Sequence, residues 1–392
     1  MSKDREVAGS NGTGTDVCTR KSRRVHQIFF IKEVKMQKRI LLHLGILSLL
    51  LILFTSSASA WARHDQTTTE VVRDLGWLDR FSNVTVTEYL YDDQTINDVK
   101  IRYYNPEPKY LEPDEFYYHF LYEPVQFFQG AEVGKTISAK QILIDFCDEP
   151  DWEMDQHLQL SWMQAFHGES QGYRHLYYPT GSFHIPMGFI GQGRAPARAQ
   201  HFYDLAKFAF ERGDAYWGFR FLARALHYVQ DMSQPMHTRQ FHWSYIDVID
   251  PYYGTLQTIK NYHFAFESYI ANSFRLEQQD VLPKRFVSAV RYSLPVPADS
   301  AEGLAKYIAR RSYWQSSNTW KITAEFFGDR HKSNKATAIS EDDFFELIAR
   351  DDEVALRFNE DIESRMVLWG KATKSFLEFA RKDLNLDEYS IS

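Results

Sequence analysis

Apolar residues recur every three to four positions over most of the chain beyond about residue 137, a spacing typical of amphipathic helices. Pro196 opens one such stretch and Gly213 closes it, as expected for the two ends of a helix. Pro235 ends the next stretch. The helices expected in this part cover residues 196–213, 214–232, 300–328, 341–350 and about 353–384.

Two sequence signatures mark the starts of later helices. Asp299 with Glu302, and Ser340 with Asp343, have the spacing of a capping box, in which two side chains satisfy backbone N–H groups at a helix start. Residues 176–195 are rich in Gly, Pro and aromatic side chains and predict a loop. The pattern therefore predicts a mainly α fold, with one multi-helix domain.

A different periodicity precedes the helices. Residues 84–104 alternate apolar and polar side chains around the sequence Asp92-Asp93-Gln94. Alternation with a period of two, interrupted by turn residues, is typical of a β-hairpin. We expect a small hairpin inserted into the helical domain.

The first sixty residues have the features of a leader. Lys38 and Arg39 precede the apolar run Ile40–Phe54, and Ala58-Ser59-Ala60 provides an A-x-A cleavage site. Residues 1–60 are therefore interpreted as leader and signal peptide with Met36 as the start, and residues 61–392 as the exported domain, periplasmic or secreted. The alternative is an uncleaved membrane anchor at 40–54, although this run is shorter than the ~20 residues of a spanning helix.

Composition narrows the class of protein. The chain has 44% apolar and 25% charged residues, which excludes a disordered chain and a polytopic membrane protein. Two cysteines exclude a disulfide-rich scaffold and a Cys-rich zinc fold. The net charge is −7, and residues 1–60 carry ten Lys/Arg and four Asp/Glu, so the remainder carries −13. Such an acidic domain is poorly suited to an extended polynucleotide groove.

The candidate chemistry lies in three histidines and two carboxylates. His227 and Asp231 are four residues apart on an expected helix, so they share one face at a separation that suits two ligands of one zinc ion. His237 follows Pro235 and can return to the same region. His263 and Glu267 repeat the four-residue spacing.

The stretch His227-Tyr-x-x-Asp-x-x-x-Pro-x-His237 resembles the signature of zinc-dependent phospholipase C, a fold shared with the single-strand-specific zinc nucleases. Arg174–Pro179 is similar to the family segment that supplies a further histidine ligand, here His175. Trp61 would be the first residue after signal cleavage, and the family binds metal through an N-terminal tryptophan. Cys147–Asp151 lies where the family has an upstream carboxylate ligand.

The resemblance implies two or three zinc ions. One would be held by Asp148, His175, His227 and Asp231, a second by His237, His263 and Glu267, and a third by Trp61, His64 and Asp231, which would bridge. The upstream carboxylate stays open among Asp148, Asp151 and Asp155, with Asp148 preferred. By analogy with the family, Asp148 would also accept the proton of the attacking water.

The resemblance, together with the leader, implies a secreted zinc-dependent phosphodiesterase of phospholipase C type, acting through a metal-activated water. Its partners would be a phospholipid or other phosphodiester substrate and, transiently, a membrane surface. One alternative is the nuclease branch of the family, with nucleic acid as substrate only. The other alternative is a catalytically silent helical protein that keeps zinc for structure.

Overall fold

The computed structural model describes residues 63–91, 95–96, 99–100, 132–151, 155, 169–180, 191–239 and 253–390. These residues are mainly helical, which confirms the predicted fold class. The helices before residue 240 are α2 (His64–Val72), α3 (Ala139–Phe146), α5 (Glu169–His175), α6 (Ala195–Glu211), α7 (Ala215–Asp231) and α8 (Pro235–Thr238). Those after it are α9 (Tyr253–Gln278), α10 (Arg285–Arg291), α11 (Ala301–Phe327), α12 (Glu341–Ile348) and α13 (Glu353–Asp383). Short 3₁₀ helices are η1 (Gly76–Phe81), η3 (Glu149–Asp151) and η5 (Gly328–His331).

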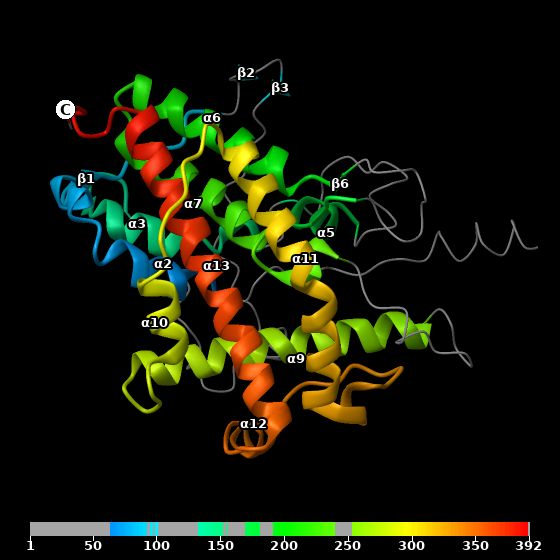
Figure 1. Cartoon of the computed structure of the whole chain (residues 1–392). Helices are drawn as coiled ribbons and strands as arrows, with labels where there is room; N and C mark the ends of the chain where they lie inside the picture. Colours follow the sequence, from blue (N-terminus) through cyan, green and yellow to red (C-terminus); the bar gives the residue numbers. More distant parts are fainter. Residues whose placement is uncertain are drawn as a thin grey trace, which may run out of the picture. The chain divides into compact units, whose positions relative to one another are not determined.

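Helix α7 forms the centre of this part of the chain, because every one of its residues is buried. Helix α6 packs along it, and α3, α11 and α13 contact it as well (Figure 1). The α6–α7 approach is close: a Cβ on Gly218 would lie 2.7 Å from the ring of Phe210. A helix buried on all sides normally carries only apolar residues, so the polar residues of α7 require partners.

The helix boundaries agree well with the sequence pattern. Pro196 lies in the first turn of α6, and Ser340 and Asp343 form the predicted capping box of α12. The start of α11 differs by one residue: Ser300 is the N-cap and accepts a hydrogen bond from the backbone of Gly303, so the predicted Asp299–Glu302 box is wrong. Pro235 begins α8 and follows the end of α7 at Asp231.

The predicted hairpin is only partly correct. Val84–Thr85 (β1) pairs with Thr136–Ile137 (β4), far along the chain. Thr95–Ile96 (β2) pairs with Val99–Lys100 (β3), so the reversal falls after Ile96; the predicted turn at residues 92–94 lies outside the described residues. In the expected loop, Tyr177–Tyr178 (β5) pairs with Gln192–Gly193 (β6).

The leader, the cleavage site and the 40–54 run also lie outside the described residues. Across the described ranges, we find no helix with the length and apolar character that a membrane crossing requires.

A buried ionic network joins α7 to η3. The carboxylate of Glu149 accepts hydrogen bonds from the guanidinium groups of Arg220 and Arg224, and all three side chains are at least nine-tenths buried. Burial opposes ionisation of Glu149, but the two arginines outweigh it and hold the pKa of this carboxyl below its ordinary value. The network fixes η3 against the central helix.

We expect Arg220→Met to lower the free energy of unfolding by about 3–5 kcal/mol, because it leaves a buried carboxylate with one of its two cations removed. Chemical denaturation of the purified protein would measure this. Arg357→Met is the matched control: Arg357 pairs with Glu325 at 3.0 Å at the surface, and such pairs contribute less than about 1 kcal/mol. Equal effects of the two substitutions would contradict a stabilising role for the network.

Candidate metal centre

The polar residues of α7 form one buried stripe. Arg220, Arg224, His227 and Asp231 are spaced by four, three and four residues, so their side chains share one face of the helix. The two arginines bind Glu149, and the Nδ1–H of His227 donates to the backbone carbonyl of Cys147 at 2.7 Å. The stripe therefore holds the whole segment 147–151 against α7.

Two imidazoles and one carboxylate converge at the end of this stripe. Nε2 of His227 lies 3.0 Å from Nδ1 of His175, and Oδ2 of Asp231 lies 3.1 Å from His175 and 3.4 Å from His227. Oδ1 of Asp151 adds a second carboxylate, 3.5 Å from His175 and 3.6 Å from His227. Bonds of ~2.0–2.1 Å at tetrahedral angles separate neighbouring zinc ligands by ~3.3 Å, so these distances suit one ion.

A second group of three lies on α8 and α9. Ring and carboxylate atoms of His237, His263 and Glu267 are within 4.8 Å of one another. Nε2 of His263 is 2.8 Å from Oε1 of Glu267, as the four-residue spacing predicted. The side-chain amide of Gln234 donates to the same carboxylate oxygen at 2.7 Å and orients it.

His64, on α2, completes a third group with Asp151 and His227. Its Nδ1–H donates to Oε1 of Gln230 at 2.7 Å, and Gln230 is itself held by Thr68 and Thr373. Nε2 of His64 therefore faces the cluster, 3.5 Å from Asp231 and 3.9 Å from Asp151. Trp61, the other ligand expected here, lies outside the described residues.

Asp231 connects the groups. Oδ2 of its carboxylate faces His175 and His227, whereas Oδ1 faces His64 at 3.5 Å and His237 at 3.4 Å. The side chain is completely buried. One carboxylate thus meets four imidazoles with two separate oxygens, the arrangement that a bridging ligand requires.

The structure points to Asp151 rather than the preferred Asp148 as the upstream carboxylate. Asp148 lies near Asp65, which pairs with Arg63, and it also interacts electrostatically with His64. Among the described residues, the groups that could hold a metal ion include Asp151 and do not include Asp148. The backbone N–H of Asp151 donates to the carbonyl of Asp148, as in a 3₁₀ turn. Side chains three residues apart in such a turn point in the same direction, so the sequence alone does not distinguish Asp148 from Asp151.

Asp155, the third alternative, lies on the outer side of the His175 ring and helps to position it. Its carboxylate accepts a hydrogen bond from the phenol of Tyr228 at 2.5 Å and pairs with Arg198 at 2.6 Å. It is 3.9 Å from Nε2 of His175, the ring nitrogen turned away from the cluster. The side-chain amide nitrogen of Gln171 lies 2.9 Å from the same ring nitrogen, so these residues fix the ring that presents Nδ1 to Asp231.

Burial keeps key imidazoles neutral and therefore able to offer a lone pair. It lowers the pKa of His227 to about 3 and the pKa of His263 to about 4. Burial would also lower the pKa of His64, but Asp231 outweighs it and raises this pKa, so a cation bound at Nε2 of His64 would replace a proton. Burial would raise the pKa of Asp231, but His227 and His237 outweigh it and hold this pKa well below its usual range. Burial raises the pKa of Glu267 to about 8, so its carboxylate form needs a cation beside it.

Buried polar atoms normally have a hydrogen-bond partner. The buried atoms of the described residues that form no hydrogen bond include Nε2 of His64 and Oε2 of Glu267, which both belong to the groups described above. A lone pair on nitrogen and a carboxylate oxygen are both donors to a metal ion. The residues therefore fit bound cations, and these buried groups could hold them.

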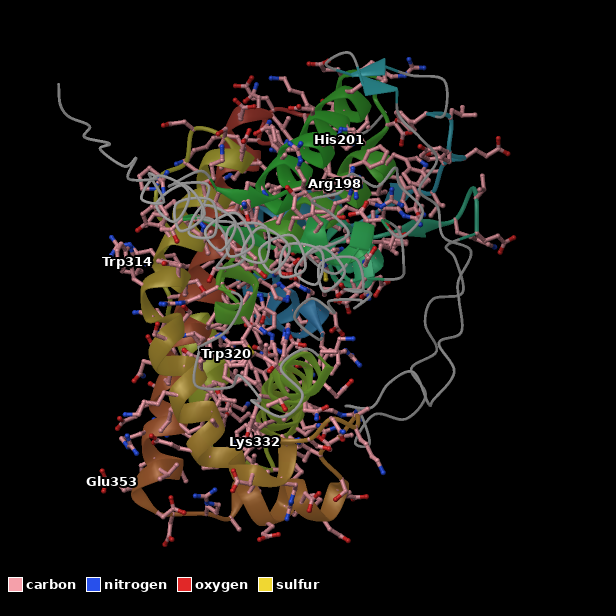
Figure 2. All side chains as sticks on the ribbon, turned by 90° about the vertical axis from the view of Figure 1, so that its right-hand side faces the viewer. Arg198, His201, Trp314, Trp320, Lys332 and Glu353 are labelled. Atoms are coloured by element: carbon pink, nitrogen blue, oxygen red, sulfur yellow. The ribbon has the colours of Figure 1, made fainter. Side chains whose placement is uncertain are left out.

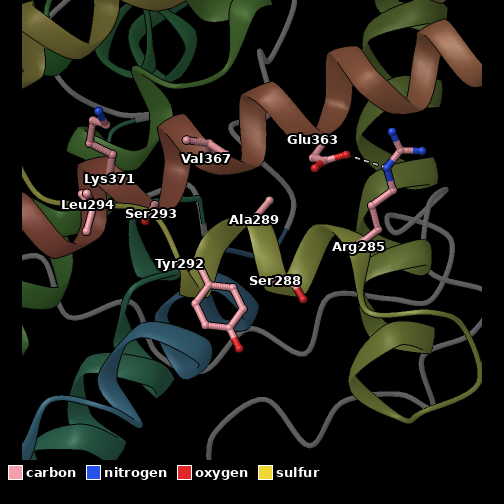
Figure 3. A pocket seen from close by; sticks show the side chains of 9 residues that line it. All are labelled: Arg285, Ser288, Ala289, Tyr292, Ser293, Leu294, Glu363, Val367 and Lys371. Carbon is pink, nitrogen blue, oxygen red and sulfur yellow. Dashed lines mark hydrogen bonds and ion pairs between the residues drawn. The ribbon is translucent and has the colours of Figure 1, made fainter.

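A pocket of about 520 Å³ between α10 and α13 shares no residue with this cluster (Figure 3). The Arg285–Glu363 ion pair lies at one side of it. His201 and His331 belong to none of the three groups. The chemistry is thus concentrated around Asp231.

No protein-family model matches the chain, and no curated protein matches it.

We expect His227→Ala to remove at least one bound metal ion per chain, because His227 belongs to two of the three groups. Metal content of the purified protein, measured by elemental analysis, is the first readout. The second is the rise in melting temperature on adding zinc, since a ligand at 1,000 times its Kd stabilises by about 4 kcal/mol. His201→Ala is the control and should keep both values; an unchanged metal content in His227→Ala would remove His227 from the centre.

Proposed function

We propose that the chain is a zinc-dependent phosphodiesterase similar to zinc-dependent phospholipase C. The observation that carries the proposal is the bridging position of Asp231, with two imidazoles facing each of its oxygens. Phosphodiester hydrolysis is the chemistry that adjacent metal ions serve best, because the attacking and leaving oxygens both need stabilisation. His227 and His237 belong to the motif that resembles this family, and His175 belongs to the separate segment Arg174–Pro179 that is similar to it.

The residues have separable roles under this proposal. His175, His227 and Asp231, with Asp151, would hold one zinc ion, and His237, His263 and Glu267 would hold another. Zinc bound there supplies the Lewis acidity that activates a water at neutral pH and offsets the charge of the phosphodiester. Asp151 replaces Asp148 as the candidate proton acceptor, because its side chain is 23% exposed and can meet a water, whereas Asp148 is buried.

Two alternatives remain in competition. A single-strand-specific nuclease would use the same ligands. The net charge of −13 beyond residue 60 disfavours the binding of a long polyanionic substrate. A structural zinc protein would need closed coordination shells. The partial exposure of Asp151 and of His263, which is 12% exposed, supports an open site over a closed one.

We expect zinc-loaded protein to release phosphocholine from phosphatidylcholine, and Asp231→Asn to lower this rate by at least a hundredfold. The substitution keeps the shape of the side chain and removes the charge that both groups share. Asp342→Asn, an exposed carboxylate at the start of α12, is the matched control and should retain full activity.

The same preparation would be assayed for acid-soluble nucleotides released from single-stranded DNA, with and without a chelator. Release of nucleotides from DNA without release of phosphocholine from phosphatidylcholine would show that the substrate is nucleic acid and not lipid. Bound zinc without either activity would favour the structural alternative and refute the proposed enzyme.

A further inference from the structure

Helix α11 carries an exposed face with an unusual charge. Between Glu302 and Glu325 it has no acidic residue, in a chain that is acidic overall. The face instead combines four cations with three aromatic side chains, all exposed or half-buried: Lys306, Arg310, Arg311, Lys321, Tyr307, Tyr313 and Trp314. Trp314 is 77% exposed.

These side chains lie on one side of the helix. Tyr307, Arg311, Trp314 and Lys321 are separated by four, three and seven residues, so they form a stripe along α11. The opposite side is buried and includes Trp320. Figure 2 shows this contrast: Trp314 projects at the margin of the view, whereas Trp320 lies towards the interior.

The positive charge of the stripe is not neutralised along its middle. Lys306 pairs with Glu302 and Lys321 is 3.8 Å from Glu325, both at the ends. Neither Arg310 nor Arg311 has a carboxylate partner among the described residues, and the guanidinium of Arg311 lies 5.4 Å from the ring centre of Tyr307. Within the described ranges, two cations without a carboxylate partner thus lie next to the exposed indole.

The stripe is fixed to the candidate metal centre. Arg239 follows α8, which carries His237, and its guanidinium donates to Ser317 and lies 5.3 Å from the ring centre of Tyr313. The indole N–H of Trp320 donates to the backbone carbonyl of Arg239 at 3.3 Å. A partner bound on the stripe would therefore lie beside the segment that leads to His237.

We propose that this face of α11 docks the protein on an anionic lipid surface. An exposed indole with neighbouring arginines suits the boundary between headgroups and acyl chains, where the ring is buried and the cations meet lipid phosphates. An exposed stripe along one helix can meet a flat surface, whereas single-stranded nucleic acid is bound in grooves with stacking platforms. The inference rests on the lipid form of the proposed function, for which it supplies the contact with substrate.

Co-sedimentation of the full chain with vesicles tests the proposal. Vesicles of phosphatidylcholine with 30% phosphatidylserine, by our choice of composition, are compared with phosphatidylcholine alone. We expect tighter binding to the anionic vesicles, weakened by salt, and about fivefold weaker binding for each of Arg310→Gln and Arg311→Gln. Trp314→Ala should weaken binding to both vesicles. Lys332→Gln, an exposed lysine after η5, and Tyr292→Ala, an 80% exposed aromatic, are matched controls that should bind as wild type.

Hydrolysis of a soluble short-chain phosphodiester by the same variants separates docking from catalysis. If the proposal holds, Trp314→Ala keeps this activity while losing vesicle binding. Vesicle binding that is unchanged in all three α11 variants would overturn the docking face, as would variants that instead lose binding to single-stranded DNA. Absence of hydrolysis in the zinc-loaded wild type, with vesicle binding intact, would refute the proposed enzyme and leave the docking face supported.

Discussion

The carboxylate of Asp231 is the group on which the rest of the candidate centre depends. It is completely buried, and an isolated buried charge is expensive because it loses its hydration. Here each oxygen meets two imidazoles, at 3.1–3.4 Å on one side and 3.4–3.5 Å on the other. The four rings come from different segments of the chain, so keeping this one anion ionised requires much of the fold to be in place.

The surrounding structure can be understood from this requirement. Helix α7 is buried along its full length and carries Asp231 at its last turn. The Glu149–Arg network holds η3 against it, which places Asp151 near the same imidazoles. Hydrogen bonds from the outward nitrogens of His64 and His227 direct their inward nitrogens at the cluster. The features expected of metal ligands are thus supported by a second layer of contacts.

Much of this arrangement could be predicted from the sequence because it is local. Spacings of four residues on helices brought His227 near Asp231 and His263 near Glu267, and apolar periodicity with Pro and Gly located the helices. His64 also joined the cluster, as the sequence analysis expected. The buried stripe that begins at Arg220 was missed, although the regular spacing of polar residues on a largely apolar helix was a readable signal.

Features that depend on distant contacts or on turn type could not be predicted from the sequence pattern. Alternation identifies a strand and does not identify its partner, so Val84 was assigned to a local hairpin and pairs with Ile137 instead. Asp148 and Asp151 eclipse in a 3₁₀ turn, so only the contacts with Asp65 and His175 distinguish them. Ser300, and not Asp299, is the N-cap of α11, and helix propensity does not locate a helix start to within one residue.

The most direct measurement is a crystal structure of the zinc-loaded protein, with anomalous diffraction recorded on both sides of the zinc absorption edge. We predict at least two zinc peaks that share Asp231, one bound by His175 and His227 and one by His237, His263 and Glu267. Each oxygen of Asp231 should face a different ion. A single peak away from Asp231, or no peak in the cluster at saturating zinc, would contradict the account.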